Sequence, residues 1–168
     1  MSTLRIAALA LILGCTKPTP PAPTVDAGPP PLPECTLATP LVPGVPGSPG
    51  HLIPSSINPN GASELATLMR AFVEDWKAAR TVVEAGQTVS PKFPTHRKLR
   101  CAWPTDARDR NEAFDGMAVG YLDAVQKFDA APSRDTYEAV LDRCRACHEI
   151  TCGGPLEVIE GLRWKLPQ

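Results

Sequence analysis

Two cysteines and a histidine near the end of this 168-residue chain have types and a spacing suited to metal chemistry. Cys144-Arg-Ala-Cys147-His148 matches C-x-x-C-H, the pattern of covalent c-type haem attachment. In this pattern the thiols bond to one porphyrin edge, and the adjacent imidazole ligates the iron. On a helix the three residues share one face, because they stand at positions i, i+3 and i+4. We therefore interpret Cys144, Cys147 and His148 as the attachment site of one haem c, with His148 as an axial ligand.

The same residues allow three other uses. A thioredoxin-like redox pair uses C-x-x-C, but it needs a βαβ context that the sequence does not predict. A zinc ion could be bound by Cys144, Cys147, His148 and Cys152, which form an acceptable ligand set. A disulfide within the motif would suit an oxidising compartment. The position of the histidine and the signs of export favour haem.

The N-terminus predicts export. Arg5 precedes an apolar run from Ile6 to Leu13 that suits a signal peptide, which we place at residues 1–14, and is too short to span a bilayer. Ile12-Leu13-Gly14-Cys15 resembles the bacterial lipobox, and the resemblance implies that Cys15 is lipidated and anchors the mature chain in a membrane. We expect a periplasmic or cell-envelope location. The outer membrane is favoured, because Thr16 is not the aspartate that resembles an inner-membrane retention signal.

The proline distribution divides the remaining chain. Fourteen of the 20 prolines lie between Lys17 and Asn60. Residues 15–34 therefore predict an extended tether, because proline disfavours helices and central strands. Residues 35–60 also carry aliphatic side chains, and we interpret them as an irregular strap over a helical domain at residues 61–168. The net charge of −1 provides no basic footprint for nucleic acid.

Apolar residues recur at helical spacing in three long segments, at 63–85, at 109–128 and from Ser133 to about Gly153. Residues 87–106 contain three prolines and predict a loop with at most a short helical turn at 96–101. Residues 156–166 predict one more short turn. No segment has the pattern of a strand, so we expect an all-α fold that is four-helix-bundle-like, with three long helices and a weak second one.

A helical domain with CRACH on its final long helix, near the end of the chain, resembles the class II c-type cytochromes, the cytochrome c prime group. The resemblance covers residues 60–150 and implies a four-helix bundle around one haem. This chain departs from the group in its weak second helix and in the added tail ITCGGPLEVIEGLRWKLPQ. In that group, a residue of the first helix faces the iron opposite the histidine. The resemblance thus implies Met69 as the sixth ligand, with His96 and His51 as alternatives, whereas Met117 is expected to fill the core.

Chain direction places further residues at the haem end. If the last long helix ends at the haem, the helix before it must begin there. Met69, near the start of the first helix, must also lie there if it is the sixth ligand, so the first helix would run parallel to the helix at 109–128. Cys101, which precedes the helix at 109–128, and Cys152, at the end of the last long helix, then lie at the same end of the domain. We predict a Cys101–Cys152 disulfide, with Cys35 either unpaired or taking the place of Cys101.

These features predict a mono-haem lipoprotein that transfers electrons to and from redox partner proteins outside the inner membrane. A five-coordinate haem protein that binds a gas such as NO is the alternative, and a zinc-stabilised structural lipoprotein is the second alternative. No catalytic Ser/His/Asp set, phosphate loop or carboxylate pair stands out, so we do not expect an enzyme; only a weak peroxidase activity stays open.

Overall fold

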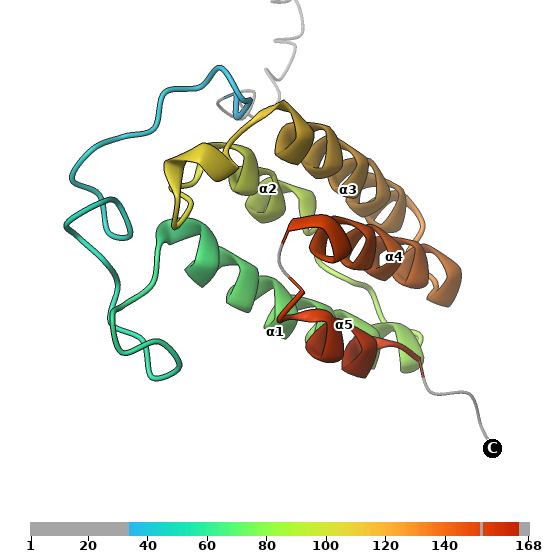
Figure 1. Cartoon of the computed structure of the whole chain (residues 1–168). Helices are drawn as coiled ribbons and strands as arrows, with labels where there is room; N and C mark the ends of the chain where they lie inside the picture. Colours follow the sequence, from blue (N-terminus) through green and yellow to red (C-terminus); the bar gives the residue numbers. More distant parts are fainter. Residues whose placement is uncertain (1–33, 152, 165–168) are drawn as a thin grey trace, which may run out of the picture. The chain divides into compact units, whose positions relative to one another are not determined.

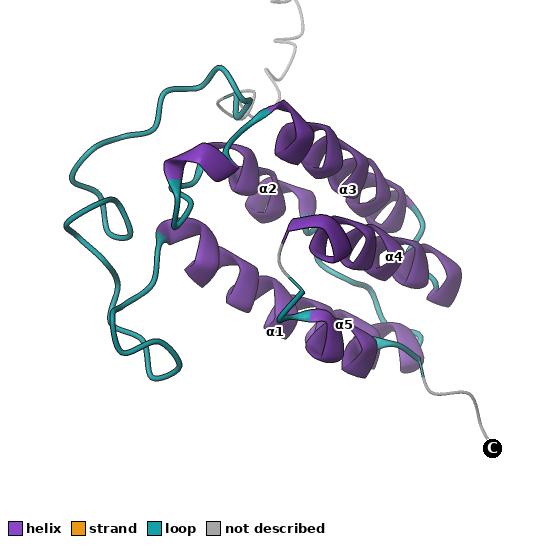
Figure 2. Ribbon diagram, in the orientation of Figure 1, coloured by secondary structure: helices purple, strands orange, loops and turns teal. Residues whose placement is uncertain are grey.

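The computed structural model describes residues 34–151 and 153–164, and within them the protein is all-α (Figures 1 and 2). The signal peptide, Cys15, Cys152 and most of the tether lie outside these residues. The elements are α1 (Glu64–Glu84), α2 (Phe93–His96), α3 (Glu112–Ala130), α4 (Arg134–Thr151), α5 (Leu156–Leu162) and 3₁₀ turns at Arg97–Cys101 and Ala107–Asp109. The described residues hold no strand, only one isolated bridge between Ile53 and Ala62. None of the helices in this part of the chain is both long and apolar enough to cross a membrane.

Local capping explains where the long helices begin and end. The Ser63 hydroxyl accepts a hydrogen bond from the Ala66 amide at the start of α1, and Gly86 follows its end with φ +65°. The Ser133 hydroxyl likewise accepts from the Thr136 amide at the start of α4. The helices predicted at 63–85 and from Ser133 are thus confirmed. The helix predicted at 109 begins instead at Glu112, because the Asn111 side chain caps the Phe114 amide.

The second helical segment is longer than the sequence pattern predicts. It runs without a break from Phe93 to Cys101, first as α2 and then as a 3₁₀ turn. Its first amides are satisfied from far along the chain, because the Asp129 carboxylate accepts hydrogen bonds from the Lys92 and Phe93 amides at 2.8 Å. Pro94 lies in the first turn, where no amide donor is needed. Periodicity alone misses a helix that begins on a cap supplied by another helix.

Contacts between the long helices confirm the expected chain directions. The Leu65 amide donates to the Trp103 carbonyl, so the chain entering α1 lies beside the chain that leads to α3. Further along both helices, the Trp76 indole of α1 donates to the Tyr121 hydroxyl of α3 at 3.0 Å. Helices α1 and α3 therefore run parallel, while α4 returns along α3 after the Ala131–Ser133 turn (Figure 1). The start of α1, the start of α3 and the end of α4 lie at one end of the domain, which we call the motif end.

The buried core extends away from the motif end. Trp76, Phe128 and Tyr137 pack edge to face, with ring centroids 5.1 to 6.3 Å apart. The C-terminal tail closes this region, since the Tyr137 hydroxyl donates to the Leu162 carbonyl at 3.0 Å and the Trp164 ring packs on Tyr137. Helix α5 is thereby held against α1 and α4.

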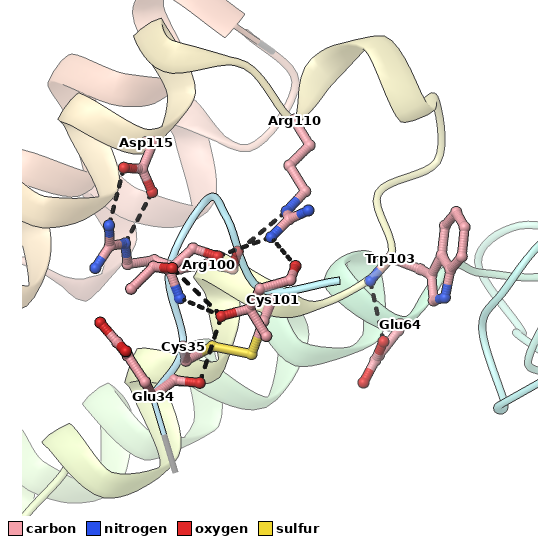
Figure 3. The surroundings of a disulfide bond; sticks show 10 residues. Glu34, Cys35, Glu64, Arg100, Cys101, Trp103, Arg110 and Asp115 are labelled. Carbon is pink, nitrogen blue, oxygen red and sulfur yellow. Dashed lines mark hydrogen bonds and ion pairs between the residues drawn. A yellow bond between two sulfur atoms is a disulfide. The ribbon is translucent and has the colours of Figure 1, made fainter. Parts of the chain in front are cut away.

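A disulfide joins the N-terminal segment to the end of the second helical segment (Figure 3). Cys35 is bonded to Cys101, with their Cα atoms 5.4 Å apart. The Arg110 guanidinium adds hydrogen bonds to the Thr36 and Thr39 carbonyls. The predicted Cys101–Cys152 pairing is therefore wrong. The contacts of residues 34–42 with the domain bring Cys35 to Cys101, and no sequence pattern anticipates those contacts.

Candidate functional site

The candidate site occupies the last two turns of α4. Cys144 and His148 continue the helix face that buries Tyr137, Val140 and Leu141, and Cys147 lies at the edge of that face. All three motif side chains are half-buried, in contrast to the fully buried residues one to three turns earlier. Within the described part of the chain, neither thiol takes part in a disulfide. The two sulfur atoms are thus available for another bond.

Burial decreases toward the motif end on all three long helices. On α1, Phe72 and Trp76 are buried, whereas Met69 and the leucines before it are only half-buried. On α3, Tyr121 is buried and Phe114 is half-buried. The half-buried residues of the motif end include the apolar and sulfur-bearing Leu65, Leu68, Met69, Phe114, Met117, Cys144 and Cys147 with His148, and also the polar Glu64, Thr67 and Asp115. At this end of the core, several apolar side chains are therefore covered incompletely by the rest of the protein.

A groove of about 360 Å³ between α3 and α4 reaches Cys147. On the α3 side, Gly116 and Gly120 leave space in the groove, because neither has a side chain and a Cβ atom at either position would meet nothing within 4 Å. Met117 and Ile150 are among its apolar lining residues. The expectation that Met117 fills the core is therefore wrong, since its side chain borders this groove beside Cys147. Only the packing of α3 on α4 reveals this position.

His96 is a core residue and not an open ligand. Its side chain is 0% exposed, and its ring stacks on Phe72 with centroids 3.8 Å apart. Nδ1 lies 2.6 Å from the Tyr121 hydroxyl, and Nε2 lies 3.2 Å from the Asp75 carboxylate. Because both ring nitrogens are engaged, His96 cannot ligate a metal without breaking this network. His51 lies in the strap, exposed, with Nδ1 near the Pro49 carbonyl.

The hydrogen-bond network determines the protonation of His96. The Trp76 indole can only donate to the Tyr121 oxygen, and the Asp75 carboxylate can only accept. Nε2 of His96 therefore carries the proton that is donated to Asp75, and the Tyr121 hydroxyl donates to Nδ1. The result is a neutral imidazole with every polar atom satisfied. Burial lowers the pKa of His96 from 6.5 to about 4, against the opposing effect of Asp75.

Acidification should therefore destabilise the fold through His96. Since the pKa of His96 is lower in the folded state, its contribution is fully present above pH 6.5 and is lost as pH falls toward 4. A shift of this size corresponds to about 3 kcal/mol of unfolding free energy. Urea unfolding across this pH range tests the effect. In His96→Gln the slope should disappear, whereas His51→Gln should retain it; equal slopes in both variants would refute the assignment.

The state of the thiols bears on the alternative uses of the motif. Burial raises the pKa of the Cys144 thiol to about 12 and also raises the pKa of Cys147. Redox-active C-x-x-C pairs instead have a lowered pKa on one cysteine, so the geometry does not favour a thioredoxin-like pair. Among residues 34–151 and 153–164, no group of three or more His, Cys, Asp or Glu side chains is placed to hold a metal ion. The zinc alternative also needs Cys152, which lies outside the described residues.

Comparison of the chain with protein-family models, with curated proteins and with solved structures finds no match. The function of the chain therefore has to be inferred from the site itself. Two thiols and an imidazole adjoin an incompletely covered apolar surface, together with a half-buried thioether at Met69. By residue type and spacing, the two thiols and the imidazole are the donor set of the C-x-x-C-H pattern.

Proposed function

We propose that the protein is a mono-haem c-type cytochrome that transfers single electrons outside the inner membrane. The observation that carries the proposal is the position of C-x-x-C-H: it lies at the end of the core where the apolar faces of α1, α3 and α4 are half-buried. Cys144 and Cys147 would hold one haem c through thioether bonds, and His148 would be an axial ligand. When bound, the haem supplies a one-electron iron couple.

The chain's own residues would bind and shield this group. Leu65, Leu68 and Phe114, which are half-buried against the core, would provide apolar contacts and exclude water from the metal. Such exclusion influences the reduction potential of an iron site. With the Phe93–Cys101 segment counted as a second helix, the domain has four helical segments before α5, the number that a class II cytochrome bundle would need. Support for this relationship consists of the motif, its place on the last long helix and the chain directions.

Met69 is the proposed sixth ligand. It is half-buried on α1 and packs beside the core at the motif end. We expect Met69→Ala to convert the matured protein from a low-spin to a high-spin spectrum and to lower its reduction potential, because thioether ligation raises the potential. Met117→Ala is the matched control, since Met117 is also half-buried and lies beside Cys147. An unchanged spectrum in Met69→Ala, or loss of the low-spin spectrum only in Met117→Ala, would reject this ligand.

A five-coordinate haem that binds a small gas is the second candidate function. It is favoured by Leu65 and Leu68, which are half-buried on α1 one position and four positions before Met69 and cannot ligate iron. A high-spin spectrum of the wild-type protein, with NO or CO binding, would support this candidate over electron transfer.

Lipidation at Cys15 is part of the proposal. The lipobox-like string Ile12-Leu13-Gly14-Cys15 would place the domain on a cell-envelope membrane, in reach of redox partner proteins. Several acyl chains on one cysteine would anchor the protein without a transmembrane helix, since each buried methylene contributes about 0.8 kcal/mol. Labelling the exported chain with a radioactive fatty acid, with Cys15→Ala as control, tests this anchor.

Optical spectra and an intact mass test the function as a whole. The full chain should be produced in a bacterium that exports and matures c-type cytochromes. We expect a Soret band, sharp visible bands on reduction, and an added mass equal to one haem that survives denaturation. A colourless protein without added mass would refute the haem site. A colourless protein that contains zinc would support the structural alternative instead.

A further inference from the structure

The groove of about 360 Å³ between α3 and α4 lies on a face that the proposed haem site does not use. Cys147 borders this groove, but Cys144 and His148, which would also hold the haem, are not among its lining residues. Most of its walls are exposed positions of the two helices, namely Glu112, Ala113 and Gly116 on α3 and Arg143, Ala146 and Ile150 on α4. The groove is therefore an outer surface of the helix pair that is open to another molecule.

The two ends of the groove carry different side chains. Helices α3 and α4 are antiparallel and joined by a short turn after Ala130, so residues at equal distances from this turn lie side by side (Figure 1). Ile150 and Glu112 therefore stand at the motif end of the groove, whereas Gly120 and Arg143 stand at its other end. Glu112 and Gly120 are eight positions apart on α3, which is a rise of about 12 Å.

An apolar projection at one end of the groove matches an empty space at the other end. Ile150 is 74% exposed at the motif end. At Gly120 there is no side chain, and a Cβ atom there would meet nothing within 4 Å. Within one molecule Ile150 cannot reach this space, because it stands at the opposite end of the groove. A half turn about an axis through the middle of the groove would place the Ile150 side chain of each copy over Gly120 of the other copy.

The charges at the two ends are complementary under the same half turn. Both the Glu112 and the Arg143 side chains are exposed, and within the described part of the chain neither forms an ion pair. Asp123, which lines the adjoining groove together with Arg143, is already paired with Lys127 at 2.7 Å. In two copies related by the half turn, each Glu112 lies at the end that holds Arg143 of the other copy. Two ion pairs therefore form by symmetry.

We propose that two copies of this chain associate through their α3–α4 faces, antiparallel and related by a twofold axis near the middle of the groove. A second copy fits better than an unrelated protein, because one surface carries both the projection and the space, and both the acid and the base. The overlap extends for about the length of the groove, so the buried area stays below the roughly 800 Å² per partner of stable complexes. The dimer is therefore weak and reversible.

Charge reversal tests the pairing by sedimentation velocity of the exported full-length chain in a density-matched detergent. The sedimentation coefficient of the wild-type protein should rise with protein concentration. Glu112→Arg alone and Arg143→Glu alone should each weaken association at least about tenfold, because like charges then meet twice across the interface. An equal mixture of the two variants should restore association, since each arginine again meets a glutamate. A wild-type protein that stays monomeric at every concentration, or a mixture that does so, would overturn the inference.

Filling the space at Gly120 tests the shape of the interface without a threat to the fold. Gly120→Leu meets no neighbour in its own chain and replaces a poor helix former by a good one, so the helix content should be kept. We expect it to weaken association about tenfold, because Ile150 of the second copy loses its place. Val119→Ser is the matched control, since Val119 is 48% exposed on α3 but does not line the groove. Unchanged association in Gly120→Leu would also overturn the inference. The haem proposal is tested separately, since a coloured monomer contradicts only the dimer.

Discussion

Replacement of both Cys144 and Cys147 by alanine is expected to leave the exported chain without covalently bound haem. In the proposed haem site, each thiol would supply one of the two bonds to the porphyrin edge, so the double variant would retain at most a haem held through His148. Denaturing mass spectrometry should show the full loss of the haem mass. Each single variant should keep one bond and yield less, but still covalent, product.

The matched control for this variant changes the two intervening residues of the motif. Arg145 and Ala146 are exposed on α4, and Arg145 pairs with Glu149 on the surface. Arg145→Ala with Ala146→Ser should therefore keep full haem content, because thiols and imidazole stay in place. A double-cysteine variant that still carries denaturation-resistant haem would show that other residues hold the cofactor, and it would contradict the assignment of the site.

Removal of the Cys35–Cys101 disulfide is expected to destabilise the fold by about 4 kcal/mol in the chain-entropy description. The bond closes a loop between residues 66 positions apart, and its loss restores that freedom to the unfolded chain. Cys35→Ala with Cys101→Ala should shift urea unfolding to a lower midpoint. The remaining contacts of the N-terminal segment, such as Arg110 with the Thr36 and Thr39 carbonyls, should then hold it less tightly.

A reductant supplies the internal control for the disulfide. Mild reduction should lower the unfolding midpoint of the wild-type protein and leave that of the double variant unchanged, because only the former has this bond to lose. An unfolding midpoint of the double variant equal to that of the oxidised wild type would mean that the cross-link contributes nothing to stability.

The Cys35–Cys101 disulfide also affects the packing of the segment that carries His96. Cys101 ends the segment that carries His96, and Arg100 beside it forms an ion pair with Asp115 near the start of α3 at 2.8 Å (Figure 3). The disulfide therefore secures the segment that fills the core between α1 and α3. A looser segment would weaken the packing of His96 on Phe72.

The amino-acid sequence by itself determined the long helices and the attachment motif. Their signals are local: apolar residues three and four positions apart form a stripe on α1, Ser63 and Ser133 provide caps within three residues, and C-x-x-C-H spans five positions. The parallel direction of α1 and α3 followed only when the short α3–α4 connection was combined with the expectation, taken from the family resemblance, that Met69 lies at the haem end. These properties depend on backbone geometry within a few turns of helix, which a linear pattern can represent.

The tertiary structure alone decided the partner of Cys101, the buried state of His96 and the groove position of Met117. Each depends on residues far apart in the chain: Cys35 reaches Cys101 across 66 positions, and Asp129 caps a segment 36 to 37 residues earlier. His96 stands in a polar, basic stretch, and nothing in that stretch indicates that Asp75 and Tyr121 will satisfy both ring nitrogens. Burial and hydrogen-bond partners are properties of the packed chain, because they arise only when separate helices exclude water together.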